Sequence, residues 1–190
     1  MLSQFSFSNF KSYKNDTTFD FQAESIPEFA DSLITDDKAI ALLPVSAVYG
    51  PNGGGKTNLL KAFACLISIV VKPIYDLDKT RVALVIQQAI SAQPFLLDTE
   101  SRDNPTEFEV YFRTEGNEYR YYLAVLNGEI DSEYLYWRAI GGKRTGTVFT
   151  REGSDIELGA SIKKNSINTD VNPKMPYLSF LAINYNIPVI

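Results

Sequence analysis

The chain has no histidine and only one cysteine among its 190 residues. Because imidazole and paired thiols are missing, the chain cannot build a Ser-His-Asp triad, a histidine-ligated metal centre or a thiolate cluster from its own residues. A single cysteine also argues against a secreted domain held together by disulfide bonds. These absences exclude more candidate chemistry than any other feature of the composition.

An excess of positive charge and long apolar runs are also lacking. Eighteen Lys and Arg against 23 Asp and Glu give a net charge of −5, so no overall basic field favours nucleic-acid or membrane binding, although a local basic patch stays open. No uninterrupted apolar stretch approaches the roughly 18 residues of a membrane span, and the amino terminus lacks the basic and apolar regions of a signal peptide. We therefore expect a soluble, cytoplasmic protein with no membrane partner.

Period-two alternation predicts β-structure in two regions. Phe5 and Phe7 alternate with serines, and a second candidate strand follows a turn at 17–21, so we expect an opening hairpin. Over 105–160, short strands alternate with Gly- and Asn-containing turns, which is typical of an antiparallel meander. We expect the many aromatic side chains of this meander to pack across strands rather than to stack on bases.

A strand followed by a buried helix is expected between these regions. The run 45–49 is short and β-prone, and it follows a proline. Residues 57–71 are apolar on nearly all sides, which predicts a buried helix, and Pro73 is expected to end it. A weaker helical pattern covers 79–93.

The stretch 176–190 is one of the most apolar in the chain, whereas chain termini are normally polar. We expect it to pack against the helix at 57–71 or to mediate self-association.

One motif carries specific chemistry. The segment Gly50-Pro51-Asn52-Gly53-Gly54-Gly55-Lys56-Thr57 matches the Walker A pattern G-x-x-x-x-G-K-[ST] without a mismatch. Background frequencies give about one chance match in 30,000 windows. The motif also lies between a predicted strand and a predicted helix, as a phosphate-binding loop requires. The alternative is a glycine-rich turn before a buried helix.

The residue types of this motif suit a nucleoside triphosphate with Mg²⁺. Glycines allow backbone N–H groups to turn toward phosphate oxygens, and the helix amino terminus presents further N–H groups to the same anion. Lys56 adds a cation over the β- and γ-phosphates, and the Thr57 hydroxyl is placed to ligate Mg²⁺.

Other parts of a complete NTPase are not evident. The nearest approximation to a Walker B element is 95–100, with Asp98 and Glu100 as its acids, but a solvated loop after Pro94 is the alternative. The sequence has no N-K-x-D element that would read guanine and no Leu-Ser-Gly-Gly signature. ATP is therefore favoured over GTP.

Two segments together resemble a known family. They are Phe7-Ser8-Asn9-Phe10-Lys11-Ser12-Tyr13 and Tyr49-Gly50-Pro51-Asn52-Gly53-Gly54-Gly55-Lys56-Thr57-Asn58-Leu59-Leu60. The chain resembles the ATP-binding heads of ABC-type ATPases, in particular the SMC and RecF-like group and the bacterial AAA-family ATP-binding proteins related to the OLD nucleases. In that family, an opening strand with Asn-Phe-Lys/Arg-Ser-Phe/Tyr precedes a Walker A of the form Gly-Pro-Asn-x-x-Gly-Lys-Ser/Thr-Asn.

The resemblance implies roles for individual residues. It extends the nucleotide-binding set from Gly50–Thr57 to Asn58, makes Lys56 the catalytic cation and gives Mg²⁺ to Thr57. It places Lys11 and Ser12 at the edge of the nucleotide and a Q-loop glutamine near Gln93. For Lys11 a solvated strand-end lysine is the alternative, and for Gln93 an ordinary loop residue.

The resemblance also implies the fold class: α/β, a P-loop NTPase core lobe with an antiparallel β-subdomain, corresponding to the amino-terminal half of an ABC-type head. Its expected parts are a hairpin, strand and helices over 1–95, a β-meander over 105–160 and the apolar element at 176–190. The family's signature motif and Walker B lie in a second, carboxy-terminal lobe. Hydrolysis would therefore need that lobe and a dimer partner, and the isolated chain should be inactive or very slow.

Family analogy alone suggests a DNA or phage-defence partner. Two other functions stay open. One is a self-sufficient small phosphotransferase that uses Asp98 or Glu100 as a metal-linked acid. The other is a non-catalytic, truncated interaction module.

Overall fold

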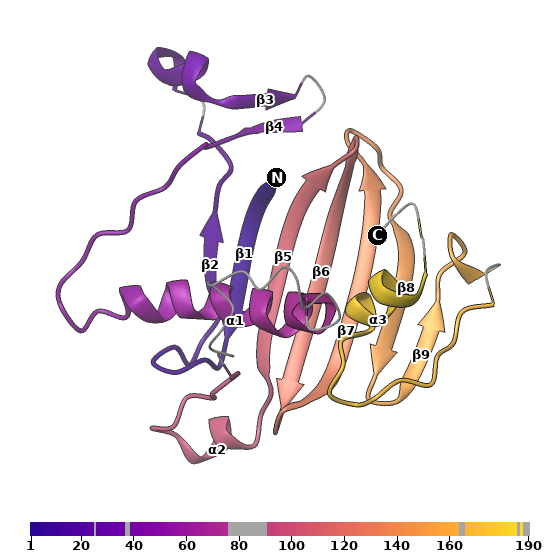
Figure 1. Cartoon of the computed structure of the whole chain (residues 1–190). Helices are drawn as coiled ribbons and strands as arrows, with labels where there is room; N and C mark the ends of the chain where they lie inside the picture. The colour runs from indigo at the N-terminus through magenta and orange to yellow at the C-terminus, as the bar shows by residue number, and fades with distance from the viewer. Residues whose placement is uncertain (25, 37–38, 76–90, 164–165, 186, 188–190) are drawn as a thin grey trace.

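The computed structural model describes residues 1–24, 26–36, 39–75, 91–163, 166–185 and 187. Its main feature is a seven-stranded antiparallel sheet with two helices over one face (Figure 1). The strands, in sheet order, are β2 (Thr17–Asp20), β1 (Leu2–Ser8), β5 (Thr106–Thr114), β6 (Asn117–Leu126), β7 (Glu129–Ala139), β8 (Gly146–Glu152) and β9 (Asp155–Leu158). The helices are α1 (Lys56–Tyr75), α2 (Thr99–Arg102) and α3 (Tyr177–Asn184). A 3₁₀ helix (Pro27–Ser32) and a separate pair of strands, β3 (Ile34–Asp36) and β4 (Ala39–Leu42), stand apart from the sheet.

The alternation of the strands separates an inner from an outer face of the sheet. Phe5, Phe7 and Leu123 are buried on the inner face, where they join a core that includes Ala62 and Cys65 of α1. Polar and tyrosine side chains of the intervening positions lie on the outer face. The period of two along each strand therefore decides which side chains meet α1.

The meander expected over 105–160 is present as β5 to β9, and tight turns explain its register. Asn127 and Gly128, which join β6 to β7, have φ values of 52° and 81°. Two consecutive positive φ angles are those of the primed turns that match the twist of a hairpin, and Asn-Gly tolerates them. The opening hairpin is also present, as β1 and β2.

The hairpin and the meander belong to one sheet. β1 pairs with β5, so that Phe7 lies opposite Phe108 and Ser8 opposite Glu107. The hairpin thus extends the same sheet beyond β5. This pairing joins residues about one hundred positions apart, which local patterns cannot reveal.

Two predictions about the Walker A flanks are wrong. Residues 45–49 form no strand, and Tyr49 is 90% exposed. Pro73 does not end the helix, because α1 continues through it to Tyr75. The ring lies in the last turn, where little helix remains to be disrupted.

The expectation that α1 is buried on all sides is also wrong. Ala62, Cys65 and Leu66 face the sheet, whereas Leu60 is 67% exposed and Ile67 and Ile74 are also exposed. By length and composition alone α1 would pass for a membrane span, a test that core helices also pass. The helical pattern expected over 79–93 falls mostly on 76–90, outside the described residues.

The apolar carboxy-terminal stretch packs against α1, one of the two arrangements expected for it. α3 lies beyond the carboxyl end of α1, over the same face of the sheet (Figure 1). Tyr177 and Leu181 are fully buried, and the Ser179 hydroxyl donates to the carbonyl of Val70 at 2.6 Å. α3 therefore completes the core beside α1.

A buried ionic cluster fastens α3 to the sheet. The Glu133 carboxylate of β7 accepts from the backbone N–H groups of Tyr177 and Leu178 at 2.6 and 2.9 Å, which caps the amino terminus of α3. It also accepts from the Tyr121 hydroxyl at 2.9 Å and lies 3.8 Å from the Arg151 guanidinium. Burial raises the pKa of Glu133, although the two N–H groups, the hydroxyl and the guanidinium stabilise its charged form.

The buried thiol of Cys65 should be inert. Burial raises its pKa to about 12, so almost no nucleophilic thiolate forms near neutral pH. We expect a disulfide reagent such as dithionitrobenzoate at pH 8 to label the folded chain very slowly and the urea-unfolded chain at once. Equally fast labelling of both would mean that the inner core is open.

Candidate nucleotide-binding site

The Walker A loop of residues 50–55 leads directly into the amino terminus of α1. Gly53 and Gly55 have φ values of 82° and 85°, a region that side chains with a Cβ rarely adopt. The N–H of Gly54 donates to the carbonyl of Pro51 at 3.2 Å, which closes the loop on itself. The loop is largely exposed, so its N–H groups are accessible to an anion.

The charges around this loop favour an anion. The first turn of α1 contains no acidic residue, so no carboxylate of its own competes for the helix amino terminus. The Lys56 ammonium curls back and donates to the carbonyls of Gly50 and Pro51 at 2.6 and 2.7 Å. Thr57, in the same first turn, is exposed. The cation and the hydroxyl thus stand together at one end of the helix.

Tyr13 lies directly against Gly55 of the Walker A loop. A Cβ added to Gly55 would lie 3.0 Å from the Tyr13 hydroxyl oxygen and 3.2 Å from the carbon that bears it. The Tyr13 ring in turn packs edge-on against Phe7 of β1, with 4.9 Å between ring centroids. Gly55 is therefore needed both for its φ angle and for its close approach to Tyr13.

The segment 9–13 connects the loop to a second part of the chain. The Asn58 side-chain amide donates to the Ser12 hydroxyl at 2.9 Å, which joins the segment to α1. The Lys11 ammonium donates to the side-chain oxygen of Gln93 at 3.0 Å, and the Lys11 N–H donates to the carbonyl of Gln93 at 2.8 Å. Ser12 thus contacts the first turn of α1, and Lys11, its neighbour in the chain, contacts Gln93.

Asn9 holds this connecting segment in place. It has a φ of 48°, and its side-chain amide donates to the carbonyls of Ser101, Asn104 and Pro105 at 2.7 to 3.1 Å. Its side-chain oxygen accepts from the N–H of Phe95 at 2.9 Å. Sequence reasoning did not assign a role to Asn9 or Tyr13, although both lie within the segment that carries the resemblance.

A comparison with protein-family models agrees with this geometry. The family described as "AAA domain, putative AbiEii toxin, Type IV TA system" matches residues 45–172, about two thirds of the chain. The chain belongs to this AAA domain family. Among curated proteins, no match is found.

Membership in the AAA domain family identifies the chain as an AAA/ABC-type P-loop ATPase lobe and indicates nucleotide binding. The matched residues contain the Walker A loop and the meander. The segment 9–13 precedes the matched region, so its resemblance to SMC, RecF-like and OLD-related proteins stays a prediction.

Asp98, one of the two acids of the Walker B approximation, has other partners in this AAA domain. Asp98 begins α2, where it accepts from the Glu100 N–H at 3.2 Å and the Ser101 hydroxyl at 3.1 Å. It also forms an ion pair with Lys14, and this hydrogen bond is the main cause that lowers the pKa of Asp98. Residues 95–98 form no strand. Within the part of the chain that the structure describes, no cluster of three acidic, Cys or His residues could hold a metal.

Proposed function

We propose that the chain binds Mg-ATP through its Walker A loop and forms the amino-terminal lobe of an ABC-type ATPase head. The observation that supports this most directly is a loop with positive-φ glycines that ends on the amino terminus of α1, with Lys56 and Thr57 in its first turn. A phosphate chain at such a helix end accepts N–H bonds from the loop and the helix at once. The family match supports nucleotide binding at this level.

Each residue of the site has a proposed role. Lys56 would leave the carbonyls of Gly50 and Pro51 and contact the β- and γ-phosphates, while Thr57 would ligate Mg²⁺. Lys11, Ser12 and Gln93 would border the nucleotide; Ser12 contacts Asn58 of α1, and Lys11 contacts Gln93. The remaining proposed members, Pro51, Asn52, Gly53, Gly54, Gly55 and Asn58, supply the loop backbone and its junction with the helix.

Two exposed surfaces support the proposal that a second lobe completes this head. Leu60, Ile67 and Ile74 lie at seven-residue spacing on the outer side of α1, so they form one apolar stripe away from the sheet. The β-prone run 45–49, directly before the loop, forms no strand and exposes Val45, Val48 and Tyr49. A second lobe could pair a strand with the run 45–49 and bury the apolar stripe of α1. The division into a part over 1–95, a meander over 105–160 and a terminal element at 176–190 belongs to the same proposal.

Calorimetric titration of the chain with Mg-ATP and Mg-GTP tests the proposed site. We expect ATP to bind at least as tightly as GTP, because the chain has no N-K-x-D element whose acid would read the guanine edge. Strong preference for GTP would contradict the ATPase assignment. If neither nucleotide bound, the proposal that this loop is a nucleotide-binding site would be contradicted.

The isolated chain should hydrolyse ATP very slowly or not at all. Asp98 is held by Lys14 and the α2 cap, and no described residue offers a positioned acid at the loop. Transition-state charge in phosphoryl transfer is commonly neutralised by groups that a partner supplies, which is worth orders of magnitude in rate. Phosphate release should therefore stay far below about 1 s⁻¹, the low end of ordinary turnover. Turnover at or above that rate, lost in both Lys56→Ala and Asp98→Ala, would favour the small-phosphotransferase alternative.

The proposed partners follow from the same assignment. A homodimer partner and the second lobe would complete the site for hydrolysis. The family description suggests a toxin–antitoxin setting, and a DNA or phage-defence role rests on family analogy. A cytoplasmic location and ATP as the resident nucleotide belong to this proposal.

A further inference from the structure

The outer face of the sheet carries a groove that the Walker A site does not use. Two adjoining cavities, of about 340 and 430 Å³, share Tyr111, Glu118 and Arg138. The first extends to Arg120, Tyr136, Trp137 and Thr145, and the second extends to Ser3, Gln4, Gln22 and Arg113. We call these two cavities the outer-face groove. Because α1 covers the inner face, this groove lies on the opposite side of the sheet from the helix that carries the Walker A loop.

The groove holds more positive than negative charge, although the chain as a whole carries −5. Glu118 accepts from Arg113 at 3.1 Å and is also paired with Arg138, so one carboxylate is shared by two guanidinium groups. Arg120 pairs with Glu109 at 2.5 Å through its Nε. Three arginines thus face two glutamates. One further anion bound between the arginines would offset the excess positive charge of the groove.

The arginines keep donors for such an anion. Arg120 and Arg138 have side chains that are 50% and 52% exposed. Among the described residues, Arg120 uses only Nε and Arg138 only one Nη in hydrogen bonds. Guanidinium donors that remain beside a cavity suit the oxygens of a phosphate group.

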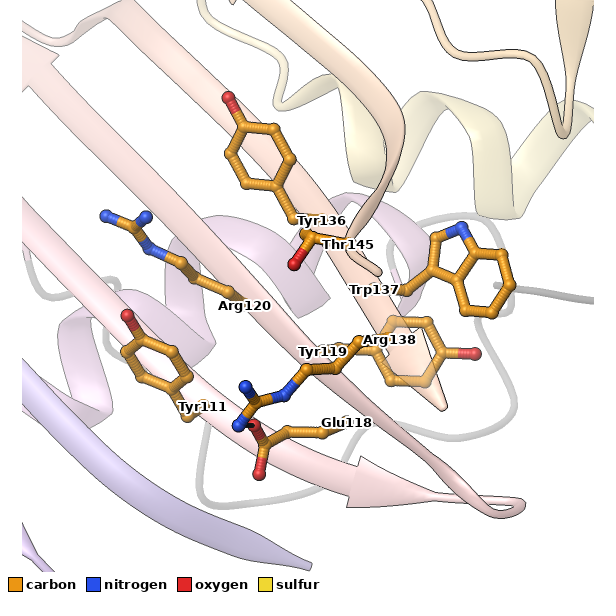
Figure 2. A pocket seen from close by; sticks show the side chains of 8 residues that line it. All are labelled: Tyr111, Glu118, Tyr119, Arg120, Tyr136, Trp137, Arg138 and Thr145. Atoms are coloured by element: carbon orange, nitrogen blue, oxygen red, sulfur yellow. Dashed lines mark hydrogen bonds and ion pairs between the residues drawn. The ribbon is translucent and has the colours of Figure 1, made fainter. Parts of the chain in front are cut away.

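Aromatic rings flank these donors. Figure 2 shows the side chains of Tyr111, Arg120 and Tyr136 on one side of the strands, with Arg120 between the two tyrosines. The Arg120 guanidinium lies 5.9 Å from the centroid of the Tyr111 ring. Tyrosine faces and a stacked guanidinium are surfaces on which a flat, ring-shaped group packs.

We propose that the outer-face groove binds a single nucleoside monophosphate, with its base against Tyr111 and Tyr136 and its phosphate on Arg138 and its neighbouring arginines. The volume suits a small molecule of this size. A longer strand is disfavoured, because Asp16, Glu107 and Glu109 line the adjoining surface beyond Arg120 and would repel further phosphates.

Isothermal titration calorimetry gives the readout, because the ring of the only tryptophan, Trp137, packs against the core on the other face of the sheet. The titration uses the Lys56→Ala chain without Mg²⁺, so that binding at the Walker A site is weakened, and follows the heat of binding of AMP, adenosine and ribose 5-phosphate. We expect AMP to bind about tenfold or more tightly than either fragment, because only AMP offers both the ring and the anion. No heat of binding with millimolar AMP, or equal binding of ribose 5-phosphate, would overturn the proposal.

Four variants test whether AMP binds in the outer-face groove. Arg138→Gln should weaken AMP binding by about tenfold or more, because it removes a charged donor while Glu118 keeps its pairing with Arg113. Arg144→Gln, an exposed arginine of the next loop that does not line the groove, should leave binding unchanged. Tyr136→Phe should retain binding, and Tyr136→Ser should weaken it, since the ring is the part that matters. Equal binding by all four folded variants, as checked by thermal melting, would overturn the assignment.

Two further ligands distinguish a nucleoside monophosphate from other possible occupants of the groove. A thymidine decamer that binds more than tenfold tighter than thymidine monophosphate would replace the single-nucleotide proposal with a single-strand surface. A hexaglutamate peptide that binds more tightly than AMP would replace it with an acidic-peptide surface. Failure of the Walker A assignment would appear separately, as a loss of Mg-ATP binding that leaves the AMP titration of the groove intact.

Discussion

Replacement of Lys56 by alanine is expected to weaken Mg-ATP binding by about 10- to 150-fold. The ammonium lies at the first residue of α1, within hydrogen-bond distance of the loop carbonyls of Gly50 and Pro51, and so stands where phosphate oxygens would bind. A hydrogen bond to a charged group contributes about 1.5 to 3 kcal/mol, which corresponds to that range of affinity. Isothermal titration calorimetry measures it directly.

A second lysine of the same helix is the control. Lys61 is exposed and lies more than one turn further along α1, so Lys61→Ala changes the same charge without touching the loop. Alanine is a good helix former, so neither variant should unfold α1. If Lys56→Ala and Lys61→Ala bound Mg-ATP as tightly as the parent chain, the Walker A loop would not be the nucleotide site.

Replacement of Glu133 by alanine is expected to lower the free energy of unfolding by about 3 to 5 kcal/mol. The side chain is fully buried, and its removal leaves the Tyr121 hydroxyl and the N–H groups of Tyr177 and Leu178 without their acceptor. It also leaves the buried Arg151 guanidinium without its counter-charge. A domain is stable by only about 5 to 15 kcal/mol, so this loss is a large part of the total. Urea unfolding followed by circular dichroism measures it.

Glu133→Gln is the matched variant, since it keeps a carbonyl acceptor of similar shape and should lose less unfolding free energy than Glu133→Ala.

Glu133→Gln also tests the pH dependence of stability. Because burial raises the pKa of Glu133 above its ordinary value of 4.5, the folded chain retains this proton more strongly than the unfolded chain. The contribution of Glu133 to stability therefore falls as pH rises above about 4.5. The unfolding free energy of the parent chain minus that of Glu133→Gln should therefore be smaller at pH 7.5 than at pH 5. A difference that does not change with pH would show that the pKa of Glu133 is the same in the folded and the unfolded chain.

Helix α1 illustrates how far an apolar pattern can be interpreted. The composition of 57–71 correctly indicated a helix, and it suggested burial on all sides. The structure instead buries Ala62 and Cys65 against the sheet and leaves Leu60 exposed. Hydrophobicity indicates that a surface needs a cover, but it does not say whether that cover is present in the same chain.

The strand predicted at 45–49 failed for a related reason. A strand needs a neighbour to pair its backbone groups, and the sheet of this chain ends at β2 on one side and β9 on the other. The residue preference of this run is local, whereas its pairing depends on another segment. The proposed second lobe would supply that neighbour.

Features that depend on neighbouring residues could be predicted from the amino-acid sequence. The Walker A loop and the helix that follows it are contiguous, and the Asn127-Gly128 turn specifies the pairing of the two strands beside it. Their physical causes are glycine φ angles, helix N–H groups and side-chain alternation, which all act over a few residues.

Contacts between residues far apart in the sequence depend on the tertiary structure and could not be predicted from local patterns. The pairing of β1 with β5, the contact between Lys11 and Gln93 and the capping of α3 by Glu133 each join parts of the chain that lie at least about 44 residues apart. Nothing in the local pattern around Glu133 distinguishes it from a solvated strand glutamate. Its burial follows from where α3 packs, because the helix amino terminus and Arg151 together provide enough hydrogen bonds and charge to keep a carboxylate away from water.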